Sequence, residues 1–228
     1  MRTLCRTTLL AGIFLLLAGL FGQPLPVVGA SPTSESTPEI NCWDYKVYLP
    51  LIANGQSNQI SSCLNGEEAQ LADLINAYRQ EKGLPPVPLS QSLTRVAQAH
   101  VRDLYENRPN TGECNLHSWS DKGNWTPVCY TPDHKYASGM WQKPAEITNG
   151  LYTGYGYEIA YWHSLQATAE GAFTAWKFSS GHNAVMIEDG IWKDMKWGAM
   201  GIGIYQNYAV VWFGQESDPL GSVSACTR

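Results

Sequence analysis

Three residues whose types can act together in metal or acid-base chemistry stand at the boundaries of expected elements: His117 in a loop, Glu158 in a strand and His182 at the start of a helical turn. Two neutral imidazoles and water can hold Zn²⁺ or a similar divalent cation in an open site, and a carboxylate can accept from a ring N–H and fix the tautomer. Used differently, Glu158 is a general base that activates water while a histidine polarises a carbonyl. Because no nucleophile or oxyanion donor is identifiable from the sequence, we favour binding over hydrolysis.

The common catalytic signatures are missing from the sequence. It contains no His-Glu-x-x-His, no Gly-x-Ser-x-Gly and no glycine-rich phosphate loop. A papain-type cysteine nucleophile is also poorly supported, since no cysteine has the required local context and oxidation is expected to consume most thiols.

Two helices are expected in the chain before His117 and His182. The first has Asn65 as its N-cap, with Glu68 three residues on, and ends before Gly83. Ser90 or Ser92 opens the second. His100 falls on the apolar face of this second helix, where a hydrogen-bonded core residue is the favoured interpretation.

The rest of the chain alternates between irregular and regular segments. Helices grouped around a small antiparallel sheet indicate a single α+β domain, with no internal repeat. We expect a loop-dominated stretch over 107–154, a strand over 157–162, a helix over 166–178, a short turn from 179, and two strands, 199–205 and 208–215, joined by a tight turn at 206–207.

The N-terminus has the pattern of a secretory signal peptide, residues 1–30. Arg2 and Arg6 precede an apolar run, and Val28-Gly29-Ala30 supplies small residues for cleavage. The alternative is an uncleaved membrane anchor, but the apolar run is shorter than the roughly 20 residues that a spanning helix needs. We therefore expect a secreted, extracellular protein with a linker and short N-terminal segment over 31–64, a domain over 65–217, and a tail over 218–228.

Export makes disulfides the expected state of the cysteines. Cys114 and Cys129 bracket a loop with little regular structure, and they are the first predicted pair. Cys63 and Cys226 flank the periodic region and form the second, weaker pair, because domain termini often lie near each other. Cys42 is then free or intermolecular.

The amino-acid composition and the net charge exclude several classes of protein. The 228 residues are 44% hydrophobic and 15% charged, which excludes a disordered or collagen-like chain. The formal net charge of −5 argues against nucleic acid as a partner.

Six short motifs occur in an order that resembles the CAP superfamily, which groups cysteine-rich secretory proteins, antigen 5 and plant pathogenesis-related proteins (the SCP domain) with many bacterial relatives. The resemblance covers about residues 66–216. The motifs are Asn76-Ala77-Tyr78-Arg79, Leu93-x-x-x-Ala97-x-x-His100-x-x-Asp103-Leu104, Leu116-His117-Ser118, Tyr157-Glu158-Ile159-Ala160, Ala175-Trp176-x-x-Ser179-x-Gly181-His182 and Gly198-x-x-Gly201-Ile202-Gly203.

The resemblance implies a three-layer α-β-α sandwich with a small central antiparallel sheet and a large cleft, in which two histidines and usually two acidic residues converge. Carried over by motif, these are His117, Glu158 and His182, with Ser179 at the fourth position, so that a triad replaces the tetrad. The residues that flank the strand glutamate, Tyr157 and Ile159, depart from the usual Gly and Asn.

The leading hypothesis is a secreted binding module whose cleft takes a divalent metal through His117 and His182, with a lipid, glycan or peptide as a further ligand. The first alternative is a metal-assisted hydrolase or protease in which Glu158 is catalytic. The second is an envelope scaffold that docks a partner through residues 47–52.

The sequence also suggests locations for other polar and aromatic residues. His163 is expected at the cleft rim, and His134 and Glu170 in solvent. An aromatic set either lines a ligand groove or forms the small core of the long loop: Trp119, Trp125, Trp141, Tyr152, Tyr155 and Trp162.

Overall fold

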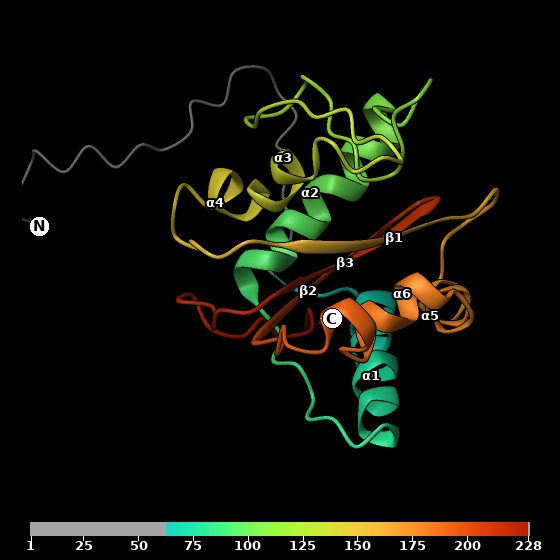
Figure 1. The fold of residues 1–228 in the computed structure, drawn as a ribbon, viewed down its shortest axis with the longest axis vertical. Helices are drawn as coiled ribbons and strands as arrows, with labels where there is room; N and C mark the ends of the chain where they lie inside the picture. The colour runs from blue at the N-terminus through green and yellow to red at the C-terminus, as the bar shows by residue number, and fades with distance from the viewer. Residues whose placement is uncertain (1–62, 228) are drawn as a thin grey trace, which may run out of the picture. The chain divides into compact units, whose positions relative to one another are not determined.

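A three-stranded antiparallel sheet in the order β1-β3-β2 is the centre of the computed structural model, which describes residues 63–227 (Figure 1). The central strand β3 is buried along its whole length. Gln206, in the left-handed region with a φ of 52°, begins the turn that joins β2 to β3, as expected. The strands are β1 (Tyr157–Trp162), β2 (Ala199–Tyr205) and β3 (Tyr208–Gly214).

Helices cover both faces of the sheet, as Figure 1 shows. Side chains of β3 point alternately to the two faces of the sheet. Val211 and Phe213 belong to the apolar cluster on one face, and Val210 and Trp212 belong to the cluster on the other. This arrangement is the predicted three-layer α-β-α sandwich. One face packs against α2 (Gln91–Asn107), and the other packs against α1 (Gly66–Glu81), α5 (Ala169–Phe178) and α6 (Ser180–Met186).

The two long helices begin at the predicted capping residues. The Asn65 side chain accepts from the Glu68 N–H and the Glu68 carboxylate accepts from the Asn65 N–H, which completes the expected capping box of α1. Ser90 is the N-cap of α2, and Ser92 lies inside the helix. The Asp218 carboxylate accepts from both serine hydroxyls and so fixes the C-terminal segment to the start of α2.

The close approach of α2 to β2 depends on two glycines of β2. A Cβ at Gly201 would overlap the backbone of Leu93 and Thr94, and one at Gly203 would overlap the backbone of Ala97. Only a residue without a side chain allows this spacing, and it sets the depth of α2 on the sheet.

The stretch over 107–154 is loop-dominated, as expected, but two short helices that the sequence does not predict occur there: α3 (Ala137–Trp141) and α4 (Lys143–Ile147). Each has five residues, too few to show a helical hydrophobic repeat. Helix α5 starts at Ala169 rather than at 166, with Thr168 as its N-cap. A 3₁₀ turn, η1 (Gly190–Trp192), follows α6.

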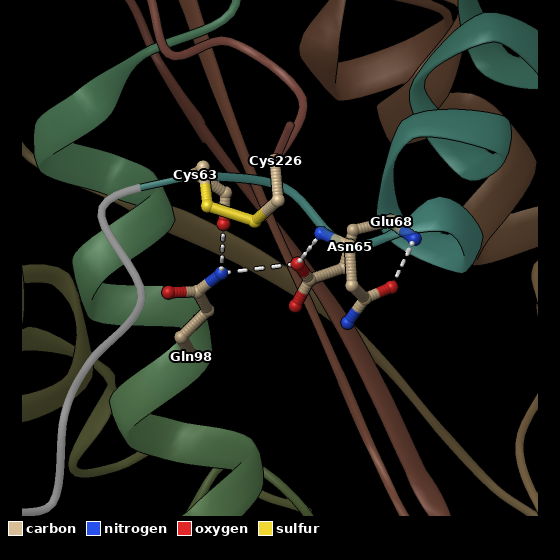
Figure 2. The surroundings of a disulfide bond; sticks show 5 residues. All are labelled: Cys63, Asn65, Glu68, Gln98 and Cys226. Carbon is tan, nitrogen blue, oxygen red and sulfur yellow. Dashed lines mark hydrogen bonds between the residues drawn. A yellow bond between two sulfur atoms is a disulfide. The ribbon is translucent and has the colours of Figure 1, made fainter. Parts of the chain in front are cut away.

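Both predicted disulfides are present, Cys63–Cys226 and Cys114–Cys129. Figure 2 shows Cys63–Cys226 joining the start of the described chain to its C-terminal tail, beside α1 and α2. Gln98 of α2 donates from its side-chain nitrogen to the Cys63 carbonyl oxygen and to Glu68 (Figure 2). This corner of the domain is therefore held by covalent and polar contacts together.

Several predictions lie outside the described residues: the signal peptide, the linker as far as residue 62, Cys42 and the segment 47–52. Within residues 63–227, no helix has the length and apolar character needed to cross a membrane.

A candidate histidine and glutamate site

The carboxylate of Glu158 is the centre of the candidate site. Its side chain is fully buried, and each oxygen contacts a different imidazole. Oε1 lies 2.5 Å from His100 Nδ1, and Oε2 lies 2.8 Å from His117 Nδ1. One carboxylate thus joins β1, α2 and the loop that the Cys114–Cys129 disulfide closes.

The alternation of β1 explains why this carboxylate points toward α2. Glu158 and Ala160 share one face of the strand, and Ala160 belongs to the apolar cluster under α2, whereas Ile159 belongs to the opposite cluster. Glu158 is paired with Trp212 of β3 in the sheet register, and Trp212 contacts the His100 ring edge-on at 6.3 Å between centroids. Sheet pairing and helix packing therefore bring the two side chains together.

His100 is the buried, hydrogen-bonded residue that the sequence predicts, but its contact with Glu158 was not predicted. Its ring stacks on Trp119 with centroids 4.1 Å apart, and its Nε2 lies 2.9 Å from the Ser118 carbonyl oxygen. Both ring nitrogens therefore face oxygens that accept hydrogen bonds. With Glu158 ionised, a ring with a proton on each nitrogen donates to both oxygens. A neutral ring has one N–H and donates to only one of them; its other nitrogen then accepts from Glu158 only if the carboxyl carries the proton.

Electrostatics favour an ionised Glu158. Burial raises the pKa of this carboxyl, but the charge and hydrogen bond of His100, followed by those of His117, outweigh burial and hold the pKa below its ordinary value. The negative charge is consequently retained inside the protein because imidazole donors surround it.

His117 is held by the carboxylate but is not closed off from solvent, since its side chain is 22% exposed. An ionised Glu158 accepts from the His117 Nδ1–H, which leaves Nε2 with its lone pair when the ring is neutral. The ring packs edge-on against Tyr130, with centroids 5.2 Å apart. Burial and the charge of Glu158 raise the pKa of Tyr130, so its hydroxyl stays protonated beside the site.

His182, near the start of α6, forms a hydrogen bond with Ser179. Its Nδ1 lies 2.8 Å from the Ser179 hydroxyl oxygen. Burial lowers the pKa of His182, and repulsion by the charge of a protonated His117 lowers it further. The two imidazoles thus influence each other, and His182 tends toward the neutral form, which is the form that ligates metals.

The remaining histidines and Glu170 lie apart from Glu158. His163 follows β1 and donates its backbone N–H to the Asn207 carbonyl oxygen, and no contact in the described part of the chain links it to the site. His134 is exposed, and its ring shares a hydrogen bond with the Tyr130 hydroxyl. Glu170 is exposed and accepts from Gln70.

The aromatic set divides between core and surface. Trp119 and Tyr152 are buried, and Trp125 and Trp141 pack against the same cluster, so that these four form the core of the long loop. Tyr155 and Trp162 are exposed instead. Tyr130, which contacts His117, was missed, because a lone tyrosine after a cysteine carries no sequence signal.

The fit of a metal ion can be judged from the donors present. Within residues 63–227, no group of three or more His, Cys, Asp or Glu side chains is arranged to hold an ion. His117 and His182 each have Nδ1 engaged, and so each has Nε2 left to act as a ligand. Imidazole nitrogen is a donor that a divalent cation accepts, with its other positions filled by water or by a bound molecule.

Comparison with known proteins agrees with the fold. The model of the cysteine-rich secretory protein family, the CAP family, matches residues 72–214. The chain belongs to the cysteine-rich secretory protein family. The match includes His100, His117, Glu158 and His182. No curated protein matches this family member.

The solved structures that are similar to this CAP protein include three from bacteria. A cysteine-rich secretory protein from Staphylococcus aureus is 14% identical, with a TM-score of 0.42 over 66% of this chain and 39% of its own. An extracellular protein containing an SCP domain from Bacillus anthracis is 18% identical, with a TM-score of 0.45 over 66% and 41%. An outer surface protein from Borrelia burgdorferi is 17% identical, with a TM-score of 0.41 over 65% and 91%. The alignment thus spans about two fifths of the first two proteins.

Proposed function

We propose that this CAP protein is a secreted binding module in which His117 and His182 ligate a divalent cation, with Zn²⁺ as the first ion to test. The observation that carries the proposal is the 2.8 Å contact between His117 Nδ1 and the buried carboxylate of Glu158. A carboxylate that accepts from one ring nitrogen fixes the tautomer and raises the basicity of the other, which is the usual support of a metal-bound histidine.

His182 has the properties of a second ligand. If its Nδ1–H donates to the Ser179 hydroxyl oxygen, its Nε2 is left as the unprotonated donor. Its lowered pKa increases the neutral fraction near pH 7. Two imidazoles with the remaining positions open make a site that can also take an oxygen of a lipid, glycan or peptide ligand.

The hydrolase alternative has less support from the geometry. A general base must reach a water molecule, but both oxygens of Glu158 contact imidazole nitrogens and the side chain is fully buried. We assign Glu158 to positioning of the two rings. A bound ion would supply Lewis-acid polarisation of a ligand oxygen, and the residues of the chain bind and orient it.

The proposal is tested by calorimetric titration of the purified protein with Zn²⁺ at neutral pH, because protonated imidazoles do not ligate. We expect one ion per chain, with at least a tenfold loss of affinity for His117→Ala and for His182→Ala, and no measurable binding in the double variant. His163→Ala is the matched control, since this histidine has no contact with the site in the described residues. Equal binding by wild type and double variant would refute the proposal.

Secretion is tested separately. Expression of the full-length chain followed by N-terminal sequencing of the protein in the medium should find cleavage after Ala30. Retention of the intact chain in the membrane fraction would show that the N-terminus is an anchor.

A further inference from the structure

A hollow lies where the far end of the sheet meets the end of α2, and none of its lining residues belongs to the site at Glu158. Its volume is about 380 Å³, which falls in the range of small-molecule sites. Its lining includes Tyr105, Arg108, Asn110, Trp162, Asn207 and Tyr208.

Two large aromatic side chains of this hollow are left in solvent. Trp162 ends β1 and is 52% exposed, and Tyr105 near the end of α2 is 38% exposed. Trp162 stands opposite the buried Tyr208 in the β1–β3 register, and this pairing fixes its strand position. A half-exposed tryptophan forgoes much of the free energy of apolar burial, and it keeps surface available for a ligand.

The tyrosine side of the hollow is packed in place. Tyr105 contacts Tyr205 edge-on, with centroids 5.4 Å apart, and the Arg102 guanidinium lies 4.5 Å from the centre of the Tyr205 ring. These contacts order Tyr105 before any ligand arrives, so that binding costs less side-chain entropy.

Planar polar groups border the aromatic side chains. The Asn207 side-chain nitrogen donates to the carbonyl oxygens of His163 and Leu165, which leaves its oxygen as an acceptor. Asn110 Oδ1 is buried and has no hydrogen-bond partner among the described residues, a costly state that a donor supplied through the hollow would relieve. Arg108, in the left-handed conformation after α2, adds a guanidinium.

This combination matches the chemistry of a sugar ring. A pyranose presents an apolar C–H face that packs on an aromatic ring, and hydroxyls at its edge that bond to planar amide and guanidinium groups. The single arginine of the lining and the net charge of −5 disfavour a polyanion. A proline-rich peptide would instead need a groove lined mainly by aromatic residues, and here polar groups are as prominent.

We propose that this hollow is a glycan-binding site that takes one or two pyranose rings, with Trp162 and Tyr105 as stacking platforms and Arg108, Asn110 and Asn207 as polar contacts. The site is independent of the proposed cation site and does not rest on it.

Saturation-transfer NMR of the purified protein tests this proposal with cellobiose, maltose, lactose, mannobiose and N,N′-diacetylchitobiose, each at about 10 mM. We expect transfer to at least one of these disaccharides, with a weak dissociation constant of about 1 mM. Trp162→Ala should reduce affinity at least tenfold, and Arg108→Ala should reduce it several-fold. Leu165→Ala is the matched control, because Leu165 is 81% exposed nearby but does not line the hollow.

The variants distinguish loss of the glycan site from loss of the fold. Because Trp162 is half exposed, its variant should keep the wild-type melting temperature, and a loss of affinity then reports on the site. No transfer to any of the five disaccharides, or equal transfer in wild type and Trp162→Ala, would overturn the proposal. Binding of a polyproline peptide that depends on Trp162, without sugar binding, would replace a glycan with a peptide. The His117→Ala, His182→Ala variant should keep full sugar binding.

Discussion

His100 Nδ1 and Glu158 Oε1 lie 2.5 Å apart, and neither side chain is exposed to solvent. The pair connects α2 to the edge strand β1, and the second oxygen of the same carboxylate holds His117. The buried contact between helix and sheet thus also determines how a partly exposed imidazole is presented to solvent.

Removal of His100 should destabilise the fold and weaken the site together. In His100→Leu the carboxylate loses one of its two imidazole partners and the Ser118 carbonyl loses its donor, so that we expect the free energy of unfolding to fall by about 3–5 kcal/mol. Urea denaturation measures the loss. His163→Ala should stay within about 0.5 kcal/mol of wild type. A His100→Leu variant as stable as that control would show that the buried pair contributes nothing.

Substitution of Gly201 should disturb the packing of α2 on β2. In Gly201→Ala the new methyl group meets the backbone of Leu93 and Thr94, which cannot move without displacing α2, and we expect a loss of about 3 kcal/mol. Gly181→Ala is the control, because a Cβ there has open space, and its stability should be unchanged or raised by up to about 1 kcal/mol. Thermal unfolding of both variants distinguishes close packing from a general effect of alanine; equal melting temperatures would contradict the packing argument.

The attachment of the C-terminal segment to α2 should depend on pH. Burial raises the pKa of Asp218, but hydrogen bonds from Ser90 and Ser92 outweigh it and hold the pKa below its ordinary value. A carboxyl whose pKa is lower in the folded state than in the unfolded state stabilises the fold at pH values above its unfolded-state pKa. This stabilisation is lost as the pH falls through the folded-state pKa.

We therefore expect Asp218→Asn to cost about 1–2 kcal/mol at pH 7, since it removes hydrogen bonds to a charged acceptor. The difference from wild type should stay constant down to about pH 5 and shrink below about pH 4. Urea midpoints measured at several pH values give this profile. A difference that grows on acidification would have the wrong sign.

The two disulfides should differ in their contribution to stability. Cys63–Cys226 closes a loop with a sequence separation of 163, and Cys114–Cys129 closes one of 15. By loop-closure entropy these stabilise by about 5 and about 3 kcal/mol. Paired Cys→Ser variants of each bridge should therefore differ by about 2 kcal/mol in denaturant unfolding, with the long-range bridge the more important. The reverse order would show that local strain or residual unfolded structure dominates.

The sequence predicts most of this fold because its elements carry strong local signals. The capping box at Asn65 and the alternation in β1 correctly place α1 and that strand. The family resemblance supplies what local signals cannot, the layer arrangement and the grouping of His117 with Glu158. Helices α3 and α4 are missed because five residues are too few to show a periodicity.

The role of His100 shows the limit of reasoning by helix face. The apolar face of α2 correctly predicts that His100 is buried, but burial alone does not reveal its partner, because Glu158 lies 58 residues away in the sequence. Tyr130 is similar, since its contact with His117 depends on how the long loop folds back. Contacts of this kind depend on tertiary packing, which no single segment encodes.

Imidazole nitrogen NMR of the ¹⁵N-histidine-labelled protein, with and without Zn²⁺, tests the central claim most directly. Without metal, the account predicts that His117 carries its proton on Nδ1, toward Glu158, and has an unprotonated Nε2. One equivalent of Zn²⁺ should then shift the Nε2 resonances of His117 and His182 and leave His100 and His163 unchanged. A proton on His117 Nε2, or resonances of His117 and His182 that Zn²⁺ does not move, would contradict it.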